Sequence, residues 1–112
     1  MKRSELKELR DTLSQSIAVG RGRYHLDDYI VMRRLLDRVD ETGNITRNVV
    51  TGASHGMKTT EYTLCRNNGK LQIWEKCILK RETGEERQVT IVHTDARDIL
   101  RIVQGYFGDF IE

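Results

Sequence analysis

The stretch YTLCRNNGKLQIWEK, residues 62–76, decides how the C-terminal half of this chain folds. Tyr62 and Leu64 alternate with polar residues, which is the pattern of a strand with one buried face, and a second strand follows from Leu71 to Leu79. Between them, Asn67-Asn68-Gly69 supplies an Asn-Gly pair, which favours the tight turn of a β-hairpin. The stretch therefore predicts two antiparallel strands.

The residues after this hairpin predict a third strand and a final helix. Residues 81–86 form a charged turn that contains a glycine, and Gln88–His93 are rich in β-branched residues. Thr94 or Asp95 then caps a helix. Three strands therefore form a meander. Before the hairpin, Val49–Thr51 fit either the end of a short helix or a short strand.

Helical periodicity dominates the N-terminal half. Apolar residues recur at helical spacing over residues 4–17, and a loop with two glycines and two arginines, residues 20–23, separates them from a helix that Asp27 caps and that ends near Thr42-Gly43-Asn44. We expect one α+β domain over residues 1–112: two N-terminal helices, then a curved antiparallel β-meander closed by a C-terminal helix. Its parts are a helical region, residues 1–52, and a sheet-plus-helix core, residues 58–112.

The C-terminal helix has more apolar residues than a single buried stripe requires. A helix that covers its own sheet with one face and a symmetry mate with the other needs apolar residues on both faces. We therefore expect a homodimer that forms through this helix. Its apolar residues are Ala96, Ile99, Leu100, Ile102, Val103, Tyr106 and Phe107.

Composition and cysteine usage describe a water-facing domain. The chain is 38% hydrophobic and 32% charged, with a net charge of +2. No apolar run has the length needed to cross a bilayer, and no apolar segment follows the basic N-terminus. Cys65 and Cys77 lack the close spacing of a zinc or redox motif. These features predict a cytoplasmic or nucleoid-associated protein with no membrane partner, no metal and no cofactor.

Strand alternation places the only tryptophan, Trp74, on a mainly polar face together with Lys76 and Lys80. An exposed aromatic side chain beside cations is typical of a base-stacking platform with phosphate contacts. Residues 58–81 contain six basic and two acidic residues, a net charge of +4. The alternative is that Trp74 packs under the first or second predicted helix and that the lysines are solvated strand residues.

Candidates for catalysis are few. A general base near neutral pH is most often a histidine, and His25, His55 and His93 have no motif around them. His25 and His93 lie beside helix starts, where capping or packing is the commoner role, so His55 in a Gly-rich loop is the best of the three. The sequence has no phosphate loop, dinucleotide fingerprint or nucleophile elbow. We therefore expect no enzymatic activity.

Residues 62–76, followed by GEERQVTI at 84–91 and a closing helix, resemble the positive cofactor four family of single-stranded-DNA-binding transcriptional coactivators. The resemblance covers the C-terminal half of the chain and rests mainly on the order of its elements. It implies a homodimer joined through the C-terminal helices, and sheets that hold unpaired DNA without sequence preference in transcription, replication or recombination. By position it implies contacts from Lys70, Trp74, Lys76, Lys80 and Arg87. The remaining candidates in the interface are Lys58, Tyr62, Arg66 and Arg81.

Two other classes of function fit the sequence. The ribosome-dependent messenger-RNA endonuclease toxins are also small and place helices before an antiparallel sheet. Tyr29, Arg33, Arg34, Arg38 and the strand lysines would then surround a scissile phosphate, but no general acid or base stands clearly opposite these arginines. A dimeric protein-interaction module would instead bury Trp74 against a protein partner. Steep salt dependence of binding would distinguish a nucleic-acid partner from a protein partner.

Overall fold

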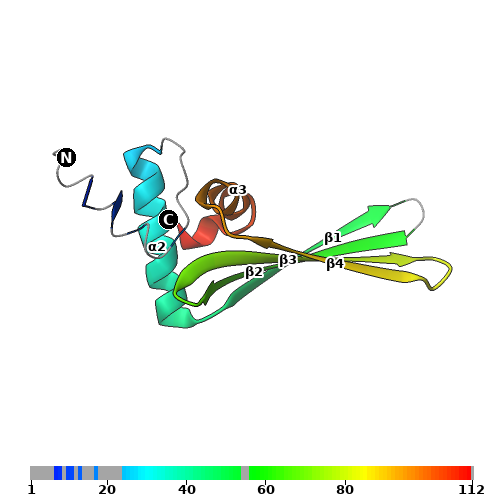
Figure 1. Ribbon diagram of the computed structural model, residues 1–112. Coiled ribbons are helices and arrows are strands. Elements are labelled where there is room, and N and C mark those ends of the chain that lie inside the picture. Colours follow the sequence, from blue (N-terminus) through cyan, green and yellow to red (C-terminus); the bar gives the residue numbers. More distant parts are fainter. Residues whose placement is uncertain are drawn as a thin grey trace.

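The protein has an α+β fold in which a helix precedes and a helix follows a four-stranded antiparallel sheet (Figure 1). The computed structural model describes residues 7, 8, 10, 11, 13, 17, 24–53 and 56–111. The strand order is β1-β2-β3-β4, so the predicted meander is confirmed. The elements are α2 (Leu26–Thr42), β1 (Ile45–Ala53), β2 (Gly56–Asn67), β3 (Lys70–Arg81), β4 (Glu86–His93), α3 (Ala96–Tyr106) and the short 3-10 helix η1 (Gly108–Phe110).

Most of the first predicted helix, residues 4–17, lies outside the described residues, as does the basic loop at residues 20–23. Of its apolar residues, Leu13 and Ile17 are described, and both are buried in the core. The amide of Ile17 donates a hydrogen bond to the carbonyl of Leu13 at 2.9 Å. This segment therefore contributes apolar side chains to the core of the domain.

The predicted second helix is α2, and its C-terminal end is confirmed by Gly43, which follows Thr42 with a φ of 80°. Its start differs from the prediction. His25 is the N-cap, and its amide donates to Oδ2 of Asp28 at 2.9 Å. Asp27 therefore lies in the first turn, where its charge favours the positive end of the helix dipole. No helix among the described residues is long and apolar enough to cross a membrane.

The fourth strand is β1, so Val49–Thr51 belong to a strand and not to a helix end. β1 pairs with β2 from Ile45 opposite Leu64 to Ala53 opposite Gly56. The sheet therefore begins at Ile45. The expected helical region, residues 1–52, thus includes most of β1, and its end at residue 52 lies within the first hairpin. The sequence signal for β1 was weak because Ile45 is the only residue of the strand that is described as buried.

Both predicted turns between the later strands are confirmed. Asn68 and Gly69 join β2 to β3 with φ values of 52° and 78°, as a two-residue hairpin turn of type I′ requires. Gly84 supplies a φ of 89° in the turn between β3 and β4, where the amide of Arg81 donates to the carbonyl of Glu85 at 2.8 Å. These turns fix the register that places Trp74 between Thr63 and Val92.

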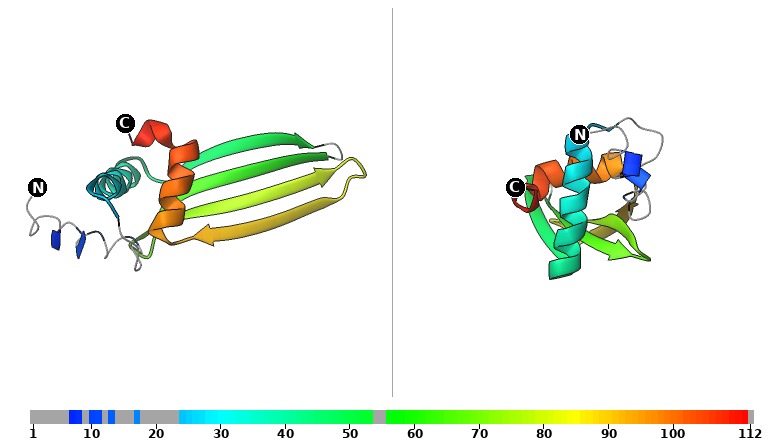
Figure 2. Two further views of the ribbon diagram at one scale, coloured as in Figure 1. Left: turned by 90° about the horizontal axis from the view of Figure 1, so that it is seen from above. Right: turned by 90° about the vertical axis from the view of Figure 1, so that its left-hand side faces the viewer.

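The helices cover only one end of one sheet face. α3 crosses the strands and α2 lies at the end of the sheet, while the two hairpins project beyond both helices (Figure 2). The elongated molecule measures 59 × 25 × 23 Å. The strand residues of the core, Ile45, Leu64, Leu71 and Ile73, all lie at the helical end. The projecting part of the sheet has no helix on either face among the described residues.

The C-terminal helix begins at its predicted cap, Asp95, whose side chain accepts a hydrogen bond from the amide of Arg97 at 2.8 Å. α3 packs on the sheet and also contacts α2. Its partly buried Leu100 belongs to the side chains packed against the same core. The apolar residues beyond a single stripe therefore have a partner within the chain, and they do not by themselves require a second subunit.

Gly56 marks a close approach between β2 and β3. A Cβ atom on Gly56 would collide with the carbonyl oxygen of Lys80 and lie 3.0 Å from Cα of Arg81. We expect Gly56→Ala to lower the free energy of unfolding by about 1–3 kcal/mol, measured by urea denaturation. Gly52→Ala is the matched control, because a Cβ there meets no atom within 4 Å. Equal losses in the two variants would contradict a steric cause.

Candidate nucleic-acid interface

The sheet face opposite α2 and α3, called here the open face, carries Trp74. The register places Thr46, Thr63, Trp74 and Val92 in one row across the four strands. Side chains alternate along a strand, so this row lies opposite the buried Ile73 and its cross-strand neighbours. Trp74 is 40% exposed. It therefore does not pack under α2, the second of the two helices named in the alternative interpretation, and most of the first, residues 4–17, lies outside the described residues.

The open face is hollowed around Trp74. The hollow has a volume of about 580 Å³ and is lined by residues of β2, β3 and β4 and by Asn44, which precedes β1. Half of the ten lining residues are polar and uncharged. The lining residues are Asn44, Glu61, Thr63, Cys65, Arg66, Asn67, Trp74, Lys76, Gln88 and Thr90.

Hydrogen bonds orient the side chains of this face. The indole Nε1 of Trp74 donates to Oε1 of Gln72, two residues earlier on the same face, at 3.0 Å. One strand pair further, the hydroxyls of Thr46 and Thr63 lie 3.2 Å apart and share a hydrogen bond. Because the indole is fixed before a ligand arrives, less conformational entropy is lost on stacking. The row thus presents a positioned aromatic ring beside small hydroxyl groups.

The charges of the open face are mostly those of β3. Lys70, Lys76 and Lys80 occupy alternate positions with Trp74 along this strand. Glu61 stands opposite Lys76 on β2, and Glu86 stands opposite Lys80 on β4. The structure shows no ion pair for Lys76 or Lys80 with any of the described residues. Both ammonium groups are therefore available to an anionic ligand.

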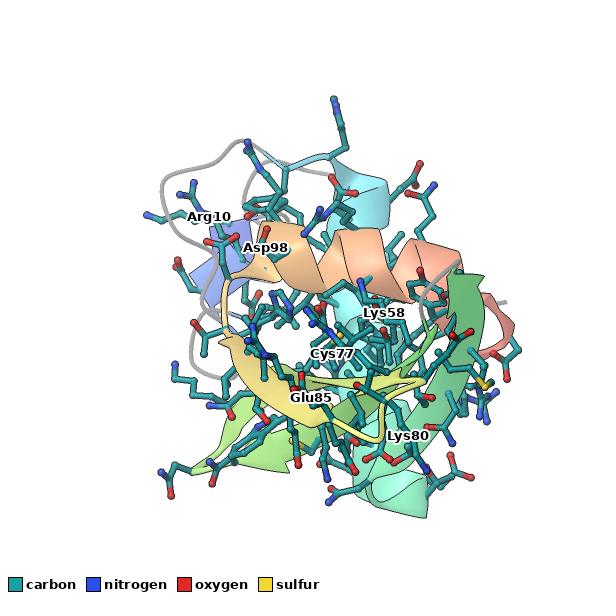
Figure 3. The ribbon with its side chains drawn as sticks, turned by 90° about the vertical axis from the view of Figure 1, so that its right-hand side faces the viewer. Arg10, Lys58, Cys77, Lys80, Glu85 and Asp98 are labelled. Carbon is teal, nitrogen blue, oxygen red and sulfur yellow. The ribbon has the colours of Figure 1, made fainter. Side chains whose placement is uncertain are left out.

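The structure does not bring all nine predicted interface residues together. Lys70, Trp74, Lys76 and Lys80 share the open face, whereas the other five occupy positions on the helix-side face of the sheet. Figure 3 shows Lys58 on the side that faces α3 and Lys80 on the opposite side. The sequence prediction counted charges along the hairpin without separating the two faces. The five residues on the helix-side face are Lys58, Tyr62, Arg66, Arg81 and Arg87.

Two of these five have partners in the helices. Arg66 pairs with Leu71 in the sheet and also reaches the rim of the hollow. Its Nη1 donates to both carboxylate oxygens of Asp40 in α2, at 2.8 and 2.7 Å. Tyr62 stacks on Tyr106 of α3 with ring centroids 4.5 Å apart. These contacts tie the sheet to the helices, and they give Arg66 and Tyr62 a structural role.

A small polar cluster lies around Tyr62. Burial, together with a hydrogen bond to Tyr106 and the nearby charge of Glu75, raises the pKa of Tyr62 to about 12. Oε1 of Glu75 also lies within hydrogen-bond distance of Nε2 of His93, at 3.2 Å, and both side chains are partly buried. The phenol is therefore held neutral, and the cluster lies on the face opposite Trp74.

The residues expected for an endonuclease do not converge. Tyr29 is only 4% exposed and belongs to the core, so it cannot face a scissile phosphate. Arg33 pairs with Asp37 at 3.6 Å, and Arg34 donates to the carbonyl of Ile111 at 2.7 Å. His55, the best histidine candidate in the sequence, lies outside the described residues. Among the described residues, no group of three or more metal-ligating side chains is arranged to hold a metal ion.

The sequence interpretation missed the polar lining of the hollow. Thr63, Thr90 and Gln88 alternate with apolar residues in their strands. This alternation identifies the core face, but it equally indicates that the three polar side chains share the other face. Thr46 was missed because β1 itself was ambiguous. Glu61 is one of the two acidic residues of the hairpin in the sequence analysis. Its position opposite Lys76 can be known only once the register between β2 and β3 is known.

No family model matches this chain, and no curated protein and no solved structure matches it either. The positive cofactor four resemblance therefore remains an expectation from the sequence. The function has to be inferred from the open face of the sheet itself.

Proposed function

We propose that the protein binds single-stranded nucleic acid across the open face of its sheet, with a base stacked on Trp74 and phosphates held by Lys76 and Lys80. One observation carries the proposal. The only tryptophan of the chain is exposed in a hollow on the open face and held by Gln72, and Lys76 and Lys80 on the same face form no ion pair with any of the described residues.

A single strand suits this face better than a duplex. In a duplex the faces of the bases are covered by their neighbours, whereas an unpaired base exposes a π-face to an aromatic side chain. Stacking tolerates every base, and the hydroxyl and amide groups around Trp74 donate and accept hydrogen bonds alike. Binding without sequence preference follows from this chemistry, and we propose that it serves transcription, replication or recombination in the cytoplasm or nucleoid. The proposed activity is binding without catalysis.

A protein partner is the second candidate for the same surface. Exposed tryptophan is common in protein interfaces, and the open face also exposes Val50, Met57 and Val92. The salt dependence of the affinity distinguishes the two candidates. Release of counterions from phosphates makes nucleic-acid affinity fall steeply with salt, whereas a protein interface of this polarity depends on salt only weakly.

The direct test is the fluorescence of Trp74 on titration with an unstructured thymidine oligonucleotide. Trp74 is the only tryptophan, so the signal reports on the proposed site alone. We expect quenching at low salt, its loss at moderate salt, and a weaker effect from a duplex of the same length. No change with the single strand under any condition would reject the proposal.

Lys76→Ala should change how binding depends on salt. Removing one phosphate contact to a single strand should make the slope of log affinity against log salt concentration shallower by about 0.7. Lys58→Ala is the matched control, because Lys58 is an exposed strand lysine on the other face. An unchanged slope for Lys76→Ala, or an equal change for Lys58→Ala, would contradict phosphate contacts on the open face.

A further inference from the structure

β4 forms one edge of the sheet and pairs only with β3 among the described residues. Its exposed apolar side chains include Val89, which is 58% exposed, and Ile91, which is 48% exposed. Natural edge strands are usually protected from association by charges, proline or bulges. Residues 88–92 of β4 read QVTIV and have none of these features. This edge is therefore suited to pair with another strand.

The other edge of the sheet, β1, is better protected. Arg47 lies within this strand and forms an ion pair with Asp109 at 2.6 Å, so a folded-back segment contacts the edge strand. Gly52 weakens the outer half of β1 as a strand. The contrast singles out β4 as the edge that is open for association.

The sequence of β4 is complementary to itself in one antiparallel register. A two-fold axis through Thr90 sets Val89 of one copy opposite Ile91 of the other, and Gln88 opposite Val92. A two-fold axis through Val89 would instead oppose Arg87 and Ile91, a charged and an apolar residue. Directly opposed apolar pairs on an antiparallel ladder stabilise it, so the register through Thr90 is the favoured one.

Charge supports the same register. The axis through Thr90 sets Arg87 of one copy opposite His93 of the other. The ring of His93 lies 3.2 Å from a carboxylate oxygen of Glu75. Each guanidinium would thus approach an acidic group of the partner copy, and the symmetry repeats this contact twice.

We propose that β4 pairs with β4 of a second copy about a two-fold axis at Thr90, giving one continuous eight-stranded antiparallel sheet. An axis perpendicular to the sheet places all helices on one face and both hollows on the other. The two Trp74 side chains would lie about 20 Å apart, because they are separated by three strand spacings across the sheet and by four residues along the strands. The pairing requires no ligand, so it stands or falls independently of nucleic-acid binding.

Val89→Lys should convert the dimer into a monomer, measured by sedimentation equilibrium over a range of protein concentrations. Val50→Lys is the matched control, since Val50 is also 58% exposed but lies on the opposite edge strand. Circular dichroism checks that both variants keep the fold. A wild-type protein that stays monomeric at all concentrations, or a Val89→Lys variant that remains dimeric, would overturn the proposal.

A cysteine at the axis tests the register. The two Thr90→Cys residues would face each other with Cα atoms within disulfide range, so mild oxidation should give a covalent dimer. Val92→Cys, opposite Gln88 in this register, should not cross-link to itself, and the wild type controls for Cys65 and Cys77. Cross-linking of Val92→Cys in place of Thr90→Cys would reject the axis at Thr90.

Discussion

Trp74→Ala is expected to weaken binding of a single strand by about 1–3 kcal/mol, which is about 5- to 150-fold in the dissociation constant. The change removes the stacking surface and leaves the lysines of β3 in place. It should not unfold the protein, because the side chain is exposed and packs under neither described helix. Binding is measured by the anisotropy of a fluorescently labelled thymidine oligonucleotide, since the variant has no tryptophan.

Tyr106→Ala is the matched control for this result. Tyr106 is also aromatic and 40% exposed, but it stacks on Tyr62 at the other face of the sheet. It should leave the affinity for the oligonucleotide unchanged. Trp74→Phe should recover part of the affinity by keeping an aromatic ring. A Trp74→Ala variant that binds as tightly as the wild type would show that the indole is no stacking platform.

The fold was predictable where local chemistry determines the backbone. The Asn68-Gly69 turn, the cap at Asp95 and the helix end at Gly43 follow from residues whose preferences are strong and short-range. β1 was ambiguous because it projects beyond the helical layer and buries few side chains. A strand whose helix-side positions beyond Ile45 are only partly buried lacks the clear apolar alternation on which a sequence prediction depends.

The candidate site was predictable in its centre but not in its extent. Trp74 and Lys76 were correctly placed on one face, because alternation within β3 needs no other strand. Lys58 belongs to β2, and its face depends on the register between the strands. Charge counted along the hairpin therefore overstated the cationic character of the open face. The opposition of Glu61 and Lys76 likewise appears only once the strands are paired.

The stability of the domain should be concentrated at the helical end of the sheet. The buried residues of the strands lie there, whereas Cys77, Ile78 and Leu79 in the projecting part of β3 are only half-buried. The projecting hairpins are held mainly by backbone pairing and, between β3 and β4, by the turn at the tip. A ligand-binding face that spans both regions thus has a rigid base and a less stable outer part.

Phe107→Ala is expected to have the largest effect on stability, a loss of about 3–5 kcal/mol in the free energy of unfolding. Phe107 is the largest of the fully buried side chains and is the C-cap of α3, where its amide donates to the carbonyl of Val103 at 2.8 Å. The guanidinium of Arg47 lies 5.8 Å from its ring centroid, so the ring also joins α3 to β1.

Urea denaturation measures this loss, and Phe110→Ala is the matched control. Phe110 lies on the same segment and packs against the same core, but it is only partly buried, so its loss should be smaller. Without urea, where both variants remain folded, each should bind the oligonucleotide with the affinity of the wild type, because neither ring reaches the open face. A Phe110→Ala loss as large as that of Phe107→Ala would show that the core extends to η1, and stability would then depend on the C-terminal segment as much as on α3.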